Sequence, residues 1–257
     1  MMSHVARAQF SNPCSQCDIE CVMRAPTFPV PQQALLECGM LRRRRLDPGK
    51  EVYRQGDGAG EFMIVASGWV GLFTLLPDGG RQILKFALPG DLIGFSAAET
   101  RERDHSAVGL TDVTLCVGSR ALMHEFLRDP AAMERIAGAL VAEQVAIRDQ
   151  LIGIARRSAL QRVARLLLDL FVRVHGHPPH AGAEMDLPLT QEQLGDALGI
   201  TTIHVNRMLG QMRRGGAAVV RRRKLRVMSP ERLLEMADTD LPSAPRARQV
   251  ESLAAAA

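Results

Sequence analysis

A helix–glycine–helix pattern at residues 187–214 gives the strongest indication of fold in this 257-residue chain. Thr190 and Gln193 have the spacing of a capping box, which predicts a helix that begins there and runs to about residue 198. Gly199 supplies the left-handed residue that ends a helix, and Thr201 can cap a second helix through about residue 213. Two helices joined by such a tight turn are typical of a helix-turn-helix. The apolar positions expected between them are Leu194, Ala197, Leu198, Ile200, Val205 and Leu209.

The second helix of this pattern has an outward face near its N-terminus that suits DNA. Arg207 can make a bidentate contact to guanine, and Asn206 can pair with adenine or contact a phosphate. Residues 213–226 hold seven basic side chains and no acidic one, and residues 217–228 predict a β-hairpin wing whose charges contact phosphates rather than bases. The alternatives are an ordinary helical hairpin and a solvated basic surface. The expected DNA-contacting residues are Thr190, Thr201, Thr202, Ile203, Asn206, Arg207, Arg213, Arg221 and Arg222.

Residues 46–118 follow a different pattern. Short apolar runs alternate there with turn sequences rich in glycine, proline and aspartate. Turn signals at this spacing predict a compact all-β domain, a sandwich or a barrel. The Pro-Asp-Gly-Gly sequence at 77–80 predicts a hairpin between strands near 69–76 and 81–88.

A helical period begins at Asp129-Pro130 and continues as a heptad repeat over 133–154. Three heptads predict a helix that pairs with its own copy in a dimer. The alternative is a helix packed against its own domain. A second helix is expected over 158–174. The expected dimer-interface residues are Met133, Leu140, Gln144, Ile147, Leu151 and Ile154.

The five cysteines are the second chemical signal in the sequence. Cys14, Cys17 and Cys21 lie within eight residues of one another, and the remaining two are Cys38 and Cys116. In a reducing compartment, such a cluster indicates metal or redox chemistry before disulfides. Three histidines within 175–180 also suit a metal, but the prolines among them give no fixed ligand geometry, so a polar linker is favoured.

Composition excludes several classes of protein. The net charge is +4 and 46% of residues are hydrophobic, which is ordinary for a soluble globular chain. Apolar runs fall far short of the ~20 residues that a membrane helix needs, and the first ten residues have no secretory apolar segment. A cytoplasmic location and no membrane partner are therefore expected. No nucleophile–base pair, metal-hydrolase spacing or phosphate loop is present, so no enzyme is expected.

The order of these parts resembles the CRP/FNR family of bacterial transcription regulators. The sequences that carry the resemblance are Pro89-Gly-Asp-Leu-Ile-Gly-Phe95, Leu189-Thr-Gln-Glu-Gln-Leu-Gly-Asp-Ala-Leu-Gly-Ile-Thr201 and His204-Val-Asn-Arg207. The resemblance implies an α+β fold with an N-terminal β-roll (a cupin-like double-stranded β-helix), a long dimerisation helix and a C-terminal winged helix-turn-helix. The resemblance covers roughly residues 30–235, and the expected domains are a Cys-bearing N-terminal arm at 1–29, a β-roll sensor domain at 30–127, the dimerisation helix at 128–157 and the DNA-binding domain at 158–236. The composition of residues 237–257 separately predicts a disordered tail.

Members of this family respond to two kinds of effector that are relevant here, cyclic nucleotides and an iron–sulfur cluster. Members that bind cyclic nucleotides have Glu and Arg at the positions of Phe95 and His105, so no cyclic AMP site is expected here, because a buried phosphate without a cation is costly. Arg103 lies two residues away and would compensate only if its strand direction matched. The FNR branch binds a [4Fe–4S] cluster through three N-terminal cysteines and one in the β-roll. This implies a cluster held by Cys14, Cys17, Cys21 and Cys116.

Three departures from the FNR pattern qualify this expectation. The first three cysteines are more tightly spaced, which leaves zinc, a thiol switch or structural cysteines as alternatives, with Cys38 the weaker ligand candidate. Ile203 and Asn206 stand where FNR-like proteins have an acid and a serine, so the DNA half-site is expected to differ. Ile147 is apolar where oxygen-switched members have an acid, which favours a dimer that persists without the cluster.

The sequence as a whole predicts a homodimeric, sequence-specific transcription regulator that responds to oxygen or redox state through a [4Fe–4S] cluster. The expected partners are palindromic double-stranded DNA, RNA polymerase and a second copy of the chain. The alternatives are a regulator of the same family with a small-molecule or haem effector in the β-roll, and a constitutive dimer with no cofactor.

Overall fold

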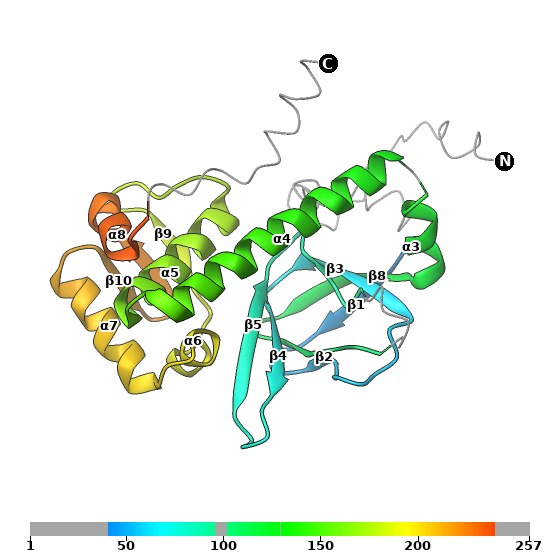
Figure 1. The fold of residues 1–257 in the computed structure, drawn as a ribbon, viewed down its shortest axis with the longest axis horizontal. Helices are drawn as coiled ribbons and strands as arrows, with labels where there is room; N and C mark the ends of the chain where they lie inside the picture. Colours follow the sequence, from blue (N-terminus) through cyan, green and yellow to red (C-terminus); the bar gives the residue numbers. More distant parts are fainter. Residues whose placement is uncertain (1–40, 96–101, 129, 240–257) are drawn as a thin grey trace, which may run out of the picture.

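The computed structural model describes residues 41–95, 102–128 and 130–239. The chain forms a β-rich N-terminal half and a mainly helical C-terminal half, and one long helix, α4 (Pro130–Arg156), runs along both (Figure 1). Cys14, Cys17, Cys21 and Cys38 lie outside the described residues, as does the expected tail from residue 240 onward. Within the described ranges, no helix has both the length and the apolar character needed to cross a bilayer.

Two antiparallel four-stranded sheets make up the N-terminal half. One sheet has the order β1-β8-β3-β6 and the other the order β2-β7-β4-β5, and among the described strands the two do not merge into a closed barrel. The expected β-roll is therefore confirmed. The strands are β1 (Leu41–Leu46), β2 (Glu51–Tyr53), β3 (Glu61–Ser67), β4 (Val70–Leu75), β5 (Arg81–Ala87), β6 (Leu92–Ile93), β7 (Ser106–Gly109) and β8 (Val113–Ser119).

The strand β3 shows why this half needs a helical cover. Its side chains alternate between two cores, as the period of a strand requires. Met63 and Val65 face the interior between the sheets. Phe62 and Ile64 face the opposite side, where they pack with the helix α3 (Arg120–Phe126) and with Ile136 of α4. A strand buried on both faces is apolar along its length, which explains the continuous run at 62–66.

The predicted hairpin at 69–88 is present as strands β4 and β5. The turn at 77–80 is closed by the backbone N–H of Leu76, which donates to the carbonyl of Gly80 at 2.8 Å, and by the carboxylate of Asp78, which accepts from the N–H of Gly80 at 2.8 Å. The pairing shifts by one residue between Leu72 and Phe73, which is a β-bulge. A bulge increases the local twist of a hairpin.

Two long helices connect the halves, and both were expected from the sequence. The helix α4 begins at Pro130. Proline suits the first turn of a helix because the N–H that it lacks would have no partner within the helix at that position. The helix α5 (Ala159–His175) is capped by Ser158 in a full capping box and ends at Gly176 in the left-handed conformation. The carboxylate of Asp149 in α4 accepts from Nη2 of Arg157, at the junction, at 2.9 Å. It also accepts from Arg165 of α5, through Nε at 2.5 Å and Nη2 at 2.9 Å. These ion pairs join the two helices at their junction.

The C-terminal half contains a helix-turn-helix flanked by a three-stranded sheet of order β10-β11-β9. A short helix at its end, α8, was not predicted and extends to Ala237, one residue into the range assigned to the tail. Ala237 is buried against the rest of this half. The elements are β9 (Glu184–Asp186), α6 (Gln191–Leu198), α7 (Thr202–Arg214), β10 (Ala218–Arg221), β11 (Lys224–Val227) and α8 (Pro230–Ala237).

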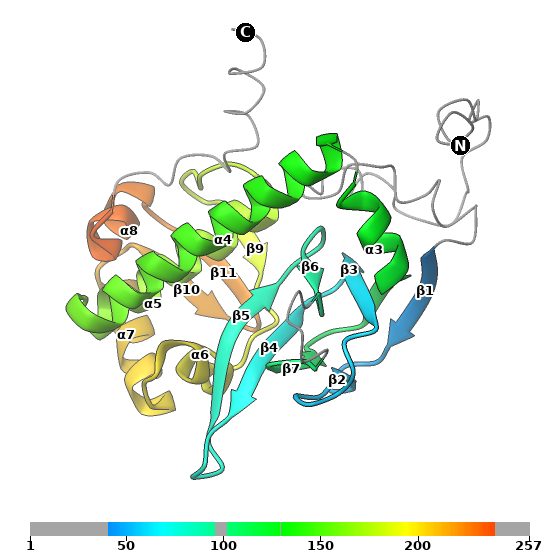
Figure 2. The ribbon, with the colours of Figure 1, turned by 45° about the vertical axis from the view of Figure 1, so that its right-hand side comes forward.

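The hairpin β4–β5 lies against α6, so the two halves share one core (Figure 2). Phe73 and Ile83 of the hairpin belong to the same buried cluster as Leu167 and Leu194 of the helical half. Arg81 donates to the carboxylate of Asp196 through Nε at 3.1 Å and Nη2 at 3.0 Å. The β-rich half therefore contacts α6, the first helix of the helix-turn-helix, directly.

Candidate nucleic-acid interface and cysteine site

The helix-turn-helix is formed through capping and glycine signals that can be identified in the sequence. Thr190 accepts from the N–H of Gln193 at 3.1 Å, and the side chain of Gln193 accepts from the N–H of Thr190 at 2.9 Å, so the predicted capping box is present. Gly199 has φ of 63°, a conformation that suits glycine. A Cβ added at Gly195 would lie 2.6 Å from the carbonyl oxygen of Ile200, so α6 packs against the turn that leads into α7 as closely as glycine allows.

The recognition helix α7 has one buried and one exposed face. Val205, Met208 and Met212 are buried against the domain, as expected. Ile203 is 80% exposed, the largest value among the exposed large hydrophobic side chains of the described residues. An isoleucine this exposed on a rigid helix suits contact with a partner. The other exposed residues of this face are Thr202, Asn206, Arg207 and Arg213.

The exposed face of α7 is hollowed into a shallow concavity lined by Ile203, Asn206, Arg207, Gly210, Arg213 and Arg214. Within the described part of the chain, the side chains of Asn206, Arg207 and Arg213 form no hydrogen bond or ion pair, so their donors face solvent. Gly210 and Arg214 were not among the predicted contacts. They follow Ile203 by seven and eleven residues, and this helical spacing was the signal that would have found them.

Two predicted DNA contacts serve first as helix caps. The hydroxyl oxygen of Thr201 accepts from the N–H of His204 at 3.3 Å and lies 2.8 Å from Nδ1 of the same histidine. The hydroxyl oxygen of Thr190 accepts within its own capping box. Each hydroxyl caps the positive end of a helix dipole, which attracts anions. Both threonines thus hold helix N-termini at the surface.

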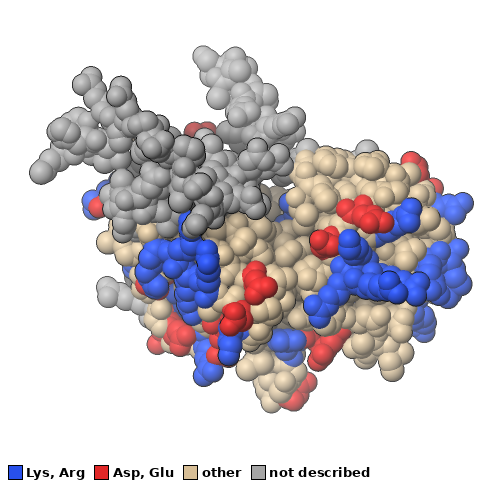
Figure 3. Space-filling model, turned by 180° about the vertical axis from the view of Figure 1, so that it is seen from behind, with Lys and Arg blue, Asp and Glu red and all other residues tan. Residues whose placement is uncertain are grey.

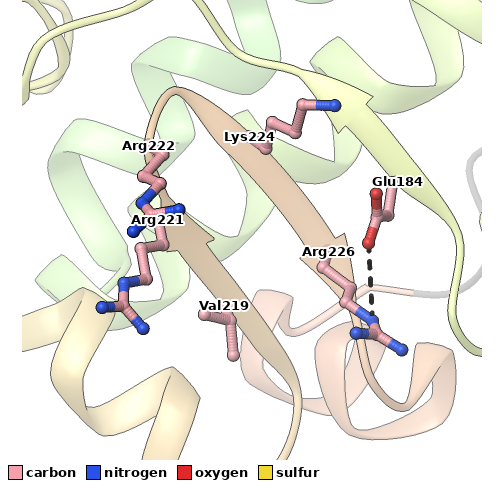
Figure 4. Close-up of a pocket in the computed structure, with 6 residues that line it drawn as sticks. All are labelled: Glu184, Val219, Arg221, Arg222, Lys224 and Arg226. Carbon is pink, nitrogen blue, oxygen red and sulfur yellow. Dashed lines mark ion pairs between the residues drawn. The ribbon is translucent and has the colours of Figure 1, made fainter.

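The predicted wing is a hairpin formed by β10 and β11, with Arg222 and Arg223 as its turn (Figure 4). Lys224 and Arg226 on β11 lie 3.7 Å from Asp186 and Glu184 of β9, respectively. Lysine and arginine side chains form a band over the half that carries the helix-turn-helix and the wing (Figure 3). This surface suits a polyanion.

The predicted dimer seam is an exposed apolar stripe on α4. Five of its six residues are large and hydrophobic and are at least 42% exposed, and Gln144 is exposed as well. Apolar exposure of this extent along one helix marks a surface that a partner covers. The five residues are Met133, Leu140, Ile147, Leu151 and Ile154.

Cys116 is the one predicted metal ligand among the described residues. It lies on β8 and is 2% exposed, in a cluster with Phe62, Met123 and Ile136. A thiol in such dry surroundings suits a soft metal centre, so the described donor fits the implied cluster in type and in environment. Cys14, Cys17 and Cys21, the remaining donors, lie outside the described residues. Within those residues, no group of three or more His, Cys, Asp or Glu side chains is arranged to hold a metal.

The interior of the β-roll contains a charged side chain whose direction the sequence did not predict. Arg103 is 6% exposed and donates to the carbonyls of Gly94 at 2.6 Å and of Glu61 at 3.1 Å. Its guanidinium lies 4.1 Å from the centre of the Tyr53 ring. The hydroxyl of Tyr53 is 2.8 Å from Nε2 of His105. Arg103 therefore points inward and is engaged by the protein's own carbonyls and ring.

Comparisons with known proteins agree with this architecture. Residues 161–236 match the Crp-like helix-turn-helix domain, and residues 43–129 match the cyclic nucleotide-binding domain. The nitrogen fixation regulation protein FixK of Rhizobium meliloti is 33% identical over 189 residues, which cover 72% of this chain and 82% of that protein. The fumarate and nitrate reduction regulatory protein of Vibrio cholerae is 24% identical over 231 residues, which cover 87% of this chain and 90% of that protein.

A solved structure extends the agreement to three dimensions. The structure of FixK2 from Bradyrhizobium japonicum matches with a TM-score of 0.69 at 25% identity, and the match covers 79% of this chain and 99% of that one. Regulators of this kind bind DNA and act as dimers. With both domain models matched in order, and with a relative above 30% identity over most of its length, this chain belongs to the CRP/FNR family of DNA-binding transcription regulators.

Proposed function

We propose that this regulator binds palindromic double-stranded DNA as a homodimer, with α7 of each copy in a major groove. The observation that carries the proposal is the exposed face of α7, where the donors of Asn206 and Arg207 face solvent. A dimer presents two such helices to successive major grooves, about 34 Å apart. Domains at 128–157 for dimerisation and 158–236 for DNA binding fit this arrangement, with RNA polymerase as the further partner.

Each residue of this face has a chemical role in the proposal. Arg207 donates two hydrogen bonds to the acceptors of guanine, and Asn206 pairs with adenine or contacts a phosphate. Ile203 has no polar atom in its side chain, so it contacts a thymine methyl group. Arg213, Arg221 and the helix N-termini at Thr190 and Thr201 bind phosphates and fix the register.

The test of this proposal is Arg207→Ala, measured on the selected palindrome and on random DNA. Loss of the bidentate contact should cost roughly 1–3 kcal/mol on the specific site and relax the preference for guanine. Arg45→Ala, an exposed arginine on β1, is the matched control and should leave binding unchanged. An equal loss on both DNAs would remove α7 from its role in base recognition.

The dimer half of the proposal rests on the apolar stripe of α4. Ile147 is 60% exposed in the single chain, and a seam position of this kind is buried when two helices pair. Ile147→Asp places two carboxylates against each other and should convert the dimer to a monomer in sedimentation experiments. A variant that stays dimeric would show that the two copies meet elsewhere.

We propose further that Cys14, Cys17, Cys21 and Cys116 hold a [4Fe–4S] cluster and that the regulator responds to oxygen or redox state. Four thiolates are the soft donor set that such a cluster requires. When bound, the cluster supplies a centre that oxidants degrade. The position of Cys116 supports the proposal, because Ile136 of the dimerisation helix belongs to the same buried cluster. An N-terminal arm tied to Cys116 would therefore influence the packing of the first turns of α4.

Release of that arm changes the relative stability of two arrangements of the paired α4 helices in the dimer. The orientation of the two recognition helices toward the DNA changes with them. The response requires that the arm be held more tightly in one arrangement than in the other. The proposal applies to the whole chain, since the arm at 1–29 carries three of the four donors.

The test is anaerobic purification, a count of iron and sulfide for each chain, and DNA binding before and after exposure to air. Wild type should be brown, bleach in air and lose DNA affinity, whereas Cys116→Ser and Cys116→Ala should contain no cluster. Cys38→Ser is the matched control and should keep it. Colourless, iron-free protein that binds DNA equally in air would contradict the proposal and favour an effector in the β-roll or a dimer with no cofactor. A sharp Soret band would favour haem.

A further inference from the structure

We propose that Arg222 and Arg223, at the tip of the wing, insert into the minor groove beside each half-site and give the regulator a preference for A·T pairs there. The proposal rests on the DNA-binding role of α7 and adds a second contact that depends on base composition. It goes beyond phosphate binding, which is indifferent to sequence. Four observations on the wing support it.

The first observation is the backbone of the turn. Arg222 has φ of 50° and Arg223 has φ of 58°, and these are two of the three non-glycine residues with positive φ in the described part of the chain. Arg221 pairs with Lys224 across the hairpin, so the turn has two residues, and positive φ at both is the type I′ geometry. This turn favours Asn-Gly because side chains strain a left-handed backbone. Arginine at both positions goes against the residue preference of this turn, which indicates that the two side chains serve a purpose other than forming the turn.

The second observation is the distribution of acidic partners. Glu184 and Asp186 on β9 lie opposite the strand residues Arg226 and Lys224, at 3.7 Å in each pair. Over the described ranges, neither Arg222 nor Arg223 has an ion pair, and both are exposed. Arg221 and Arg222 lie on the side of the hairpin away from Glu184 (Figure 4). The two acidic side chains thus compensate the basic residues of β11 and leave the positive charges of the turn available to a ligand.

The third observation is how firmly the wing is held. The carbonyl of Arg223 accepts from the N–H of Leu187 at 2.8 Å, and Leu225 and Val227 are fully buried in the domain core. The turn is therefore a fixed support for its two side chains. A side chain on a rigid support loses less conformational entropy when it binds.

The fourth observation is reach. The hairpin follows α7 directly, and the N–H of Ala217 donates to the carbonyl of Met212 at 3.0 Å, which anchors the start of β10 to the recognition helix. A strand of four residues spans about 13 Å. Neighbouring major and minor grooves are about 17 Å apart, half of the roughly 34 Å helical turn. An arginine side chain at the tip covers the remaining distance.

The minor groove supplies the chemistry that two arginines recognise. A·T-rich segments have a narrow minor groove with enhanced negative potential, which attracts inserted arginine. A G·C pair places the guanine 2-amino group in that groove. Two adjacent guanidinium groups on a narrow turn therefore favour A·T pairs without forming a contact specific to one base.

The experiment uses the full-length protein and operators with an identical half-site. The adjoining segment is A·T, G·C or inosine·cytosine, placed in the outer flank or in the central spacer in separate DNAs. Inosine lacks the 2-amino group, so its pair with cytosine resembles A·T in the minor groove and G·C in the major groove. Wild type should bind the A·T and inosine·cytosine operators about tenfold more tightly than the G·C operator, a ratio at the lower end of what one mismatched position costs.

The variant is the double substitution Arg222→Asn with Arg223→Gly, which gives the turn its preferred residues. This variant should fold at least as stably as wild type in urea, yet bind all three operators with the weaker affinity of the G·C operator. Arg226→Ala is the matched control in the same hairpin and should keep the preference for A·T.

Three outcomes would overturn the proposal. An equal loss on all three operators would reduce the tip to a phosphate contact. Inosine·cytosine behaving as G·C would place the discrimination in the major groove. Wild type without preference in either flank or spacer would remove the wing from base discrimination. Each of these leaves the role of α7 intact, because that role depends on Arg207 and on the half-site.

Discussion

The ion pair between Arg81 and Asp196 joins the two halves of the molecule, and its contribution to stability can be measured. Arg81 comes from the hairpin of the β-roll and Asp196 from α6, 115 residues later in the chain. Their side chains are 32% and 22% exposed, and one carboxylate oxygen accepts from both Nε and Nη2. A fully exposed pair contributes about 0.2–1 kcal/mol, and a hydrogen bond to a charged group about 1.5–3 kcal/mol. With about three quarters of the pair screened from water, the expected coupling is about 1 kcal/mol.

The assay is a double-mutant cycle in urea with wild type, Arg81→Ala, Asp196→Ala and the double variant. The two single variants should each lose stability, and the double variant should lose less than their sum by about 1 kcal/mol. Arg54 and Glu51, an exposed pair on the β-roll at 70% and 49% exposure, are the matched control. Their coupling should be clearly smaller than that of Arg81 and Asp196, because water and salt screen an exposed pair.

Two results would refute this reasoning. A coupling no larger than that of the exposed control would show that the contact between the halves contributes no more than a surface pair. Separate unfolding transitions for the β-roll and the helix-turn-helix would show that the shared core around Phe73 and Ile83 does not join them into one cooperative unit.

Three further predictions concern single positions. Burial alone raises the pKa of Asp149, but hydrogen bonds from Arg157 and Arg165 outweigh it and hold the pKa below its ordinary value. Its carboxylate therefore stabilises the fold above the unfolded value of about 3.9, and this contribution is lost as pH falls through the lower folded pKa. Urea titrations across that range should show a smaller loss for Asp149→Asn than for wild type. Phe171→Ala, in the buried cluster of α5, should cost about 3–5 kcal/mol in urea unfolding, and a value near 1 would indicate that the core closes over the cavity. Gly195→Ala should destabilise the domain and weaken operator binding, because its Cβ meets the carbonyl of Ile200, and unchanged melting would contradict this packing.

The local elements of this chain follow from a small number of short-range sequence signals. The capping boxes at Ser158 and Thr190, the left-handed Gly199 and the turn at 77–80 each act over a few residues. Such signals set the backbone directly, so the helix-turn-helix and the hairpins were predictable from the sequence. The outward face of α7 followed from helical period alone, as did the apolar seam of α4.

What the sequence could not determine are contacts between residues far apart in the chain. The docking of Arg81 on Asp196, the inward direction of Arg103 and the place of Cys116 beside Ile136 each depend on how finished elements pack. Periodicity fixes which face of an element is apolar, but it does not name the element that will cover that face. Short-range sequence signals are thus sufficient to predict the local elements and the chemistry on their surfaces. Which surfaces meet becomes visible in the folded molecule, because side-chain pairing across the core is selected by packing and burial of the whole chain.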